Sequence, residues 1–130
     1  MANKNLKSFF KYHFPLILYA ATVITISSMP QSTLAPIKFL AFDKFAHFLE
    51  YALFSLLAFR SFTQISGKDN VIKALTISWL FLICFAIFDE FLQSFIPGRD
   101  SDFYDILFDI SGASLVLILL TIRYKRLYKK

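Results

Sequence analysis

The residues best suited to chemistry gather in one stretch, from Asp89 to Gly112, which lies between two strongly apolar runs. This stretch contains one arginine and six carboxylates. The carboxylates are Asp89, Glu90, Asp100, Asp102, Asp105 and Asp109. Carboxylates in an apolar setting can exchange protons, bind hard cations or pair with basic groups, because burial penalises an isolated charge. We therefore expect the chain to be organised around this stretch.

A second set of ionisable residues opens the apolar segment 42–62. It comprises Asp43, Lys44, His47, Glu50 and Tyr51. The spacing of Asp43, His47 and Glu50, at i, i+4 and i+7, would place them on one face of a helix. A charge at the centre of a membrane helix costs about 2.5–3.5 kcal/mol. The face should therefore meet protein or a water-filled pocket rather than lipid.

His47 titrates near neutral pH, so it could serve as a general base or a ligand. The alternative is a structural hydrogen bond to Asp43 or to a carboxylate on another helix. We take His47, Asp89 and Glu90 as candidate catalytic residues, although the residues do not decide whether the protein is an enzyme. The candidate binding residues are Asp43, Lys44, Tyr51, Gln93, Arg99, Asp105 and Asp109.

Arg99 has two open roles. It could pair with Asp100, Asp102 or Asp105, or its planar fork could hold the phosphate or carboxylate of a ligand. Asp102 and Asp105 are spaced like a capping box and could in part cap a helix. The carboxylates would suit a hard divalent cation, but no histidine pair or cysteine cluster indicates zinc. We expect no bound metal and no other cofactor.

Four helices are expected to position these residues. Their predicted ranges are 14–30, 42–62, 71–95 and 102–122. Gly67 and the pair Pro97-Gly98 predict turns, because proline presets one corner and glycine accepts the positive φ of the next. At 1.5 Å of rise per residue, polar groups from three of these helices should meet at one level.

The composition indicates an integral membrane protein. Hydrophobic residues make up 57% of the chain, with seventeen phenylalanines, against about 45–50% apolar residues in a soluble globule. The 130 residues are expected to form one domain, residues 1–130. The net charge of +5 forms no basic stripe of the kind that binds nucleic acid, so we expect no nucleic-acid partner. Cys84 is the only cysteine and excludes an intrachain disulfide.

The basic residues predict the topology. Four crossings would put eleven of the fourteen basic residues on the side of the two termini. The three on the other side are Lys38, Lys44 and Arg99. Because basic residues favour cytoplasmic loops, we expect an all-α four-helix bundle in the cytoplasmic (inner) membrane with both termini cytoplasmic. The membrane lipid is then a partner, and the polar pocket faces the extracytoplasmic side.

The motifs resemble the VanZ-like family over about residues 27–116. The residues that carry the resemblance are Ser28-x-Pro30, Asp43-Lys44-x-x-His47-Phe48-x-x-Tyr51, Asp89-Glu90-x-x-Gln93-x-Phe95-x-Pro97-Gly98-Arg99, Asp105 and Gly112. The resemblance implies a small multi-helix membrane domain, and the member after which the family is named is associated with low-level teicoplanin resistance. Asp109 stands where the family commonly has asparagine, and Val116 where a second glycine often follows Gly112.

Two functions follow as hypotheses. In the first, the pocket acts on or binds an envelope lipid, a cell-wall precursor or a glycopeptide-type antibiotic. Arg99 and Lys44 would hold an anionic headgroup, and His47 with Glu90 or Asp89 would exchange protons. In the alternative, the chain is a non-catalytic accessory or structural membrane protein whose polar cluster only fixes the helix bundle.

Overall fold

The computed structural model describes residues 2–30, 40–67, 70–99 and 101–128. In this part of the chain there are five α-helices and no strand. The helices are α1 (Ala2–Tyr12), α2 (Phe14–Ser27), α3 (Leu40–Ser66), α4 (Val71–Gln93) and α5 (Phe103–Tyr128). The expected all-helical class is confirmed, with one helix more than expected.

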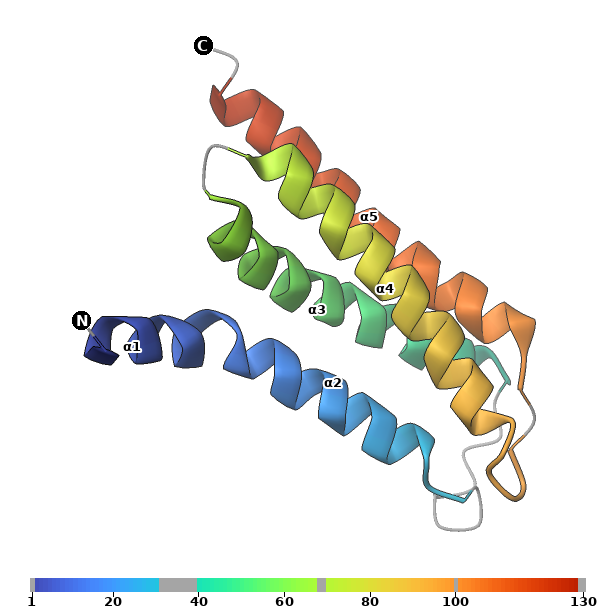
Figure 1. Cartoon of the computed structure of the whole chain (residues 1–130). Helices are drawn as coiled ribbons and strands as arrows, with labels where there is room; N and C mark the ends of the chain where they lie inside the picture. The colour runs from blue at the N-terminus through green and yellow to red at the C-terminus, as the bar shows by residue number, and fades with distance from the viewer. Residues whose placement is uncertain (1, 31–39, 68–69, 100, 129–130) are drawn as a thin grey trace.

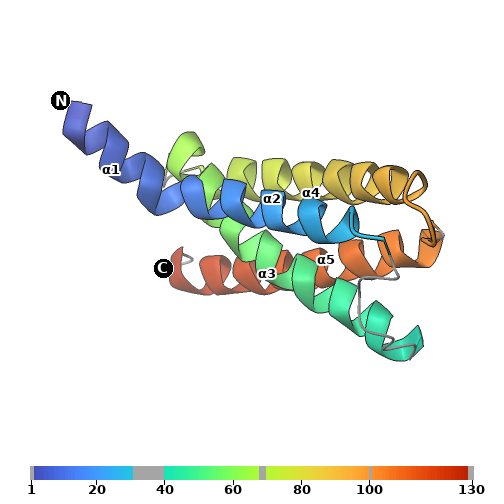
Figure 2. The same ribbon diagram turned by 90° about the horizontal axis from the view of Figure 1, so that it is seen from below.

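Helices α2 to α5 run alternately up and down, so the two chain ends lie at one end of the molecule (Figure 1). The end of α2, the start of α3, the end of α4 and the start of α5 lie together at the opposite end. Figure 2 shows α3 running obliquely past α4 and α5. Because α3 packs against every other helix, it is the central element of the fold.

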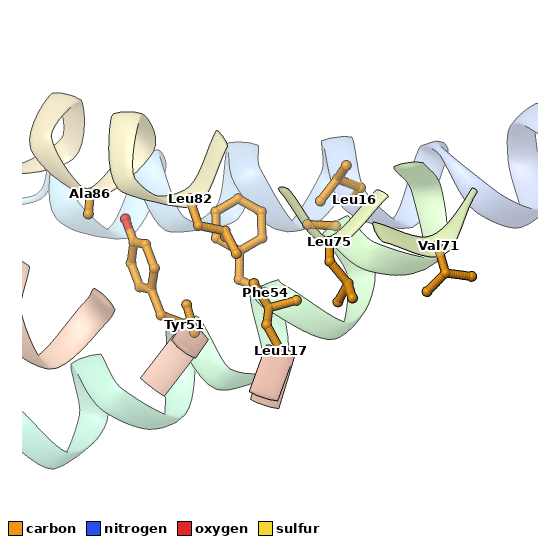
Figure 3. Close-up of a cluster of buried hydrophobic side chains, with 10 residues drawn as sticks. Leu16, Tyr51, Phe54, Val71, Leu75, Leu82, Ala86 and Leu117 are labelled. Carbon is orange, nitrogen blue, oxygen red and sulfur yellow. The ribbon is translucent and has the colours of Figure 1, made fainter. Parts of the chain in front are cut away.

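The apolar core is narrow and aromatic (Figure 3). Phe54 of α3 is fully buried, and its ring meets that of Phe85 on α4 edge to face, with 4.9 Å between centroids. Leu82 and Ala86 of α4 lie in the same cluster. Many large apolar side chains are instead exposed on the outer surface, Trp79 among them. An apolar outer surface is what a helix needs when its surroundings are lipid.

Two helices are long and apolar enough to cross a membrane. They span Val71–Gln93 and Phe103–Arg126, with mean hydropathies of 2.3 and 2.0. Helices α1 and α2, bent by 41° at a short break, together make a third candidate. α3 does not qualify by composition, because its ionisable residues lower its hydropathy. These helices are consistent with a membrane protein, and the expected four crossings stay a prediction.

The N-terminal helix α1 lies before the first expected range, 14–30, and carries Lys4, Lys7 and Lys11. Their spacing of three and four residues puts the lysines on one face of α1, while Leu6 and Phe9 lie on another. This is the pattern of an amphipathic helix.

The other helices depart from their expected ranges mainly at the ends. α2 ends at Ser27, and α3 and α5 both extend beyond the predicted segments. The residues between the expected ranges 14–30 and 42–62 lie mostly outside the described part of the chain. Both predicted glycine turns are confirmed, because Gly67 has φ 84° and Gly98 has φ 80°.

The backbones of α3 and α5 touch at Gly112. A Cβ atom at this position would come within 2.9 Å of the Phe48 carbonyl carbon and closer still to its oxygen. Only glycine fits such an approach without a shift of one helix. Since Phe48 follows His47, and Gly112 lies about one turn after Asp109, this contact sets how near those two side chains come.

Candidate functional site

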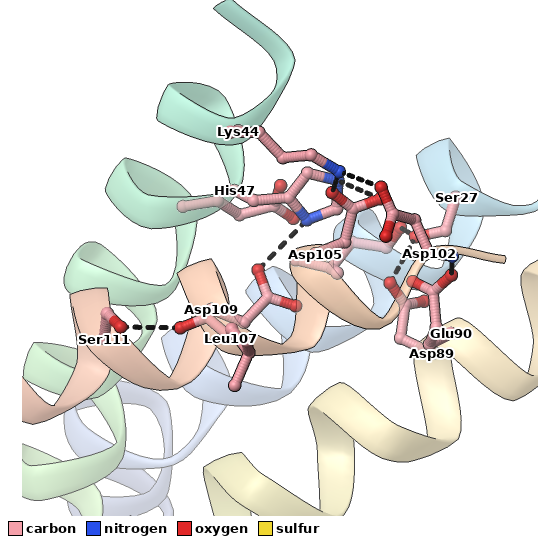
Figure 4. A network of polar contacts seen from close by, with 12 residues as sticks. Ser27, Lys44, His47, Asp89, Glu90, Asp102, Asp105, Leu107, Asp109 and Ser111 are labelled. Carbon is pink, nitrogen blue, oxygen red and sulfur yellow. Dashed lines mark hydrogen bonds and ion pairs between the residues drawn. The ribbon is translucent and has the colours of Figure 1, made fainter. Parts of the chain in front are cut away.

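His47 of α3 and Asp109 of α5 form the centre of the polar cluster (Figure 4). His47 Nδ1 lies 3.0 Å from Asp109 Oδ1, and Nε2 lies 3.9 Å from Asp105 Oδ2. The Asp109 residue is 2% exposed, and the His47 side chain is 14% exposed. The imidazole therefore lies between two carboxylates, close enough to exchange a proton with Asp109 directly.

Lys44 joins α3 to the start of α5. Its Nζ donates hydrogen bonds to Asp102 Oδ2 and Asp105 Oδ1. The bond to Asp102 holds the pKa of that carboxyl below its ordinary value. Lys44 is therefore engaged within the protein, with two of its three ammonium donors used on these carboxylates.

Asp102 caps α5, as expected, because its Oδ1 accepts the backbone N–H of Tyr104 at 2.8 Å. The second half of the expected capping box is wrong. The backbone N–H of Asp102 donates to Glu90 Oε1 on α4, whereas Asp105 binds Lys44. Glu90 thus takes the place that Asp105 would have filled, and this ties the end of α4 to the start of α5.

Asp89 of α4 is 3% exposed and is held through one oxygen. Its Oδ2 accepts from Gln93 Nε2 at 3.1 Å, because the two residues lie one turn apart on one face of α4. The Ser27 hydroxyl of α2 lies 2.9 Å from the same Oδ2 and also 2.6 Å from the Val23 carbonyl oxygen. The single hydroxyl proton can serve only one of these acceptors at a time.

The planar guanidinium group of Arg99 donates its hydrogen bonds to groups inside the protein. Its Nε donates to the Met29 carbonyl at 3.2 Å, Nη2 to the Ile26 carbonyl at 3.2 Å and Nη1 to Gln93 Oε1 at 3.1 Å. Ile26 lies in the last turn of α2, where the helix dipole favours a cation, and its carbonyl also accepts the Met29 backbone N–H at 3.1 Å. No ion pair joins Arg99 to a carboxylate in the described part of the chain. Arg99 therefore clamps α2 against the end of α4; its expected pairing with Asp102 or Asp105 is not found, and Asp100 lies outside the described residues.

Tyr51 and Asp43 lie at opposite extremes of burial. Tyr51 is 1% exposed and packs in the apolar core beneath the cluster, while Asp43 is exposed at the start of α3. Asp43, His47 and Asp105 each offer one ligand atom within 4.8 Å of the others, a set that could hold a metal ion. A metal ion would compete there with Lys44, which already binds Asp105. The absence of a metal stays a prediction.

The polar cluster is separate from a cavity of about 400 Å³ between α4 and α5. That cavity is lined mostly by apolar groups, with Trp79 donating to Ser114 at its wall. It contains none of the expected site residues. The cluster itself is a network of direct contacts in which buried carboxylates outnumber the basic groups beside them.

Some residues of the network were not among the candidates. Ser27 touches Asp89 across 62 positions of sequence, so no local spacing indicated the pair. Asp102 was expected as a cap or as a partner of Arg99, and its bond to Lys44 depends on how α3 meets α5. Glu50 was part of the predicted stripe on α3 but was not counted as a site residue, although its side chain lies within electrostatic range of His47 and Asp109.

In this fold, apolar helices enclose a buried polar cluster of carboxylates, one histidine and one lysine. The class of protein defined by this arrangement is a helical membrane-type protein with a polar centre. The sequence profile of the family described as VanZ/LLP1 matches residues 3–124. The chain belongs to this family, as the motifs predicted. No curated protein and no solved structure matches the chain.

Proposed function

We propose that this chain spans the cytoplasmic membrane four times, with both termini in the cytoplasm and the polar cluster at the extracytoplasmic end. The excess of basic residues near the termini supports this orientation. The alternating directions of α2 to α5 also support it, because they bring both termini to the end opposite the cluster.

At the extracytoplasmic end the cluster binds the polar headgroup of an envelope ligand, which is a membrane lipid, a cell-wall precursor or a glycopeptide-type antibiotic. One observation carries this proposal: Asp89, Glu90, Asp105 and Asp109 are all at most 6% exposed between apolar helices. Burying a carboxylate costs several kcal/mol, and apolar side chains would hold helices together at lower cost. His47 would exchange protons with the ligand, through its contact with Asp109.

The alternative of a purely structural cluster has its own support. Arg99 and Lys44 both donate hydrogen bonds that hold helices together. The two functions differ in what His47 is needed for, since a structural contact tolerates an amide in place of the ring, whereas proton exchange does not.

Ligand retention by the purified full chain tests the proposal. The chain in mild detergent would be mixed with phosphatidylethanolamine, an undecaprenyl-linked cell-wall precursor or teicoplanin and analysed by native mass spectrometry. We expect the wild type to retain at least one probe and His47→Gln to retain about tenfold less, which corresponds to about 1.4 kcal/mol. A changed mass of the bound probe would identify a reaction.

His13→Gln is the matched control, because His13 lies at the α1–α2 junction and pairs with Ser61, away from the cluster. Asp109→Asn serves as a second variant in case His47→Gln fails to fold. Equal retention by the wild type, His47→Gln and Asp109→Asn would show that the cluster is structural, and retention of no probe by the wild type would equally refute an envelope-ligand site.

A further inference from the structure

Two buried polar atoms in the cluster have no hydrogen-bond partner among the described residues. They are Tyr51 Oη and Asp89 Oδ1. Leaving a buried polar atom unpaired costs about 1–3 kcal/mol, more when it is charged. Tyr51 Oη offers a donor and an acceptor, and Asp89 Oδ1 offers an acceptor. A group that satisfies both must therefore donate at least one hydrogen bond.

These atoms come from facing helices. The Tyr51 side chain extends from α3 so that its hydroxyl points at α4 beside Ala86 (Figure 3). Ala86 lies one turn before Asp89 on the same helix, which places the phenol at the inner end of the carboxylate cluster. The Tyr51 side chain also lies within electrostatic range of Asp89 and Asp109. Tyr51 therefore reaches the cluster from the apolar core.

Glu50 adds a third group with spare hydrogen-bonding capacity. Its backbone carbonyl accepts from Tyr19, but its half-buried carboxylate has no hydrogen-bond or ion-pair partner in the described segments. Asp89 is within its electrostatic range. Two carboxylates and a phenol thus share one region. His47 and Arg99 lie within electrostatic range of Glu50, but their hydrogen bonds go to Asp109, to α2 and to Gln93.

The charges of the cluster are unbalanced. In the described part of the chain, the basic groups beside Glu50 and the four buried carboxylates are Lys44, His47 and Arg99. Lys44 binds the carboxylates at the start of α5, and Arg99 binds α2 and Gln93. An occupant of the region near Asp89 is therefore favoured if it is positively charged.

Lys44 shows which cation this cluster accommodates, because the chain already places an ammonium group between two of its carboxylates. An ammonium donates three hydrogen bonds and matches acceptors on separate helices. The group of residues suited to a metal, Asp43, His47 and Asp105, does not include Asp89 or Tyr51.

We propose that Asp89, Glu50 and Tyr51 bind the protonated amine of the ligand. This inference rests on the envelope-ligand function proposed above and specifies its chemistry: the headgroup enters with its ammonium toward Asp89, and not with a phosphate toward Arg99.

Matched probes test the proposal on the full chain in detergent by native mass spectrometry. Phosphatidylethanolamine carries the ammonium, and its N-acetyl derivative with the same acyl chains lacks it. We expect the wild type to retain the first at least tenfold better than the second. In Tyr51→Phe this preference should fall several-fold, whereas Tyr104→Phe, which removes an exposed hydroxyl, should keep it.

Thermal unfolding without added probe provides a second measurement. If Tyr51 Oη serves no ligand, Tyr51→Phe removes an unpaired group and raises Tm without changing the preference between probes, which would overturn the proposal.

Equal retention of both lipids by the wild type would also overturn the proposal of an amine site, while leaving an envelope ligand in place. Retention of free ethanolamine, but of no lipid, precursor or antibiotic, would keep the ammonium site and remove the envelope-ligand function. Stabilisation by magnesium or calcium chloride alone would replace the amine with a metal and refute the proposal.

Discussion

At the scale of residues, the two basic side chains expected to hold an anionic headgroup are engaged inside the protein. Lys44 offers a compact ammonium that fits between Asp102 and Asp105. Arg99 offers a planar fork whose separate nitrogens reach the end of α2 and Gln93 together. A lysine has no such fork, so the two residues are not interchangeable here.

Replacing Arg99 by lysine tests this role. Arg99→Lys keeps the charge but cannot reach three acceptors at once, so we expect a loss of about 1–3 kcal/mol in the free energy of unfolding. Thermal or denaturant unfolding in detergent would measure it. Arg123→Lys, at an exposed position of α5, should change stability little. If both variants unfold alike, Arg99 does not clamp α2.

At the scale of elements, α3 combines requirements that conflict in a membrane helix. Its first half carries the ionisable residues of the cluster, and its middle carries the aromatic core around Phe54. These needs are met because α3 is covered by the other helices, so its polar face meets α5 and α4 rather than lipid. The close approach at Gly112 is what brings the polar faces of α3 and α5 within hydrogen-bond distance.

A methyl group at Gly112 should separate these faces. In Gly112→Ala the new Cβ would overlap the Phe48 backbone, so α5 must move away from α3. We expect about 1–3 kcal/mol of destabilisation, as for other overpacked sites, and a longer His47–Asp109 distance. Unfolding in detergent and the ¹⁵N resonances of the His47 ring would report the two effects. Ser111→Ala, on the exposed face of the same turn, should leave both unchanged, and unaltered ring resonances in Gly112→Ala would contradict the positioning role.

At the scale of the whole molecule, the arrangement of the helices separates two kinds of polar group. Helix α1 and the C-terminal end of α5, which carry basic residues, lie at one end of the molecule, and the end of α4 and the start of α5, which carry the carboxylate cluster, lie at the other. In a membrane, such a separation would orient the protein through the positive-inside rule.

Cysteine labelling tests the orientation. In a Cys84→Ser background, Ser101→Cys lies at the cluster end and Asn70→Cys at the opposite end, and both positions are exposed. We expect a membrane-impermeant maleimide to label Ser101→Cys from outside intact cells and Asn70→Cys only after the cells are opened. Labelling of Asn70→Cys alone from outside would invert the topology.

The sequence alone determined the all-helical class, the family and the turns, because these depend on composition, short motifs and local backbone preference. Apolar runs predicted the start of α4 and of α5 to within one residue, and the glycines at 67 and 98 predicted positive φ. It also placed Asp89 and Gln93 on one face, since they are one helical turn apart.

Only the tertiary structure decided which polar groups meet. Arg99 turns toward α2, Lys44 toward the start of α5, and Ser27 toward Asp89, and each of these contacts joins segments on different helices. Sequence spacing describes neighbours on one helix, whereas partners across a bundle depend on helix rotation and on close approaches such as that at Gly112. The same reason explains why the unpaired atoms of Tyr51 and Asp89 could not be foreseen from the chain.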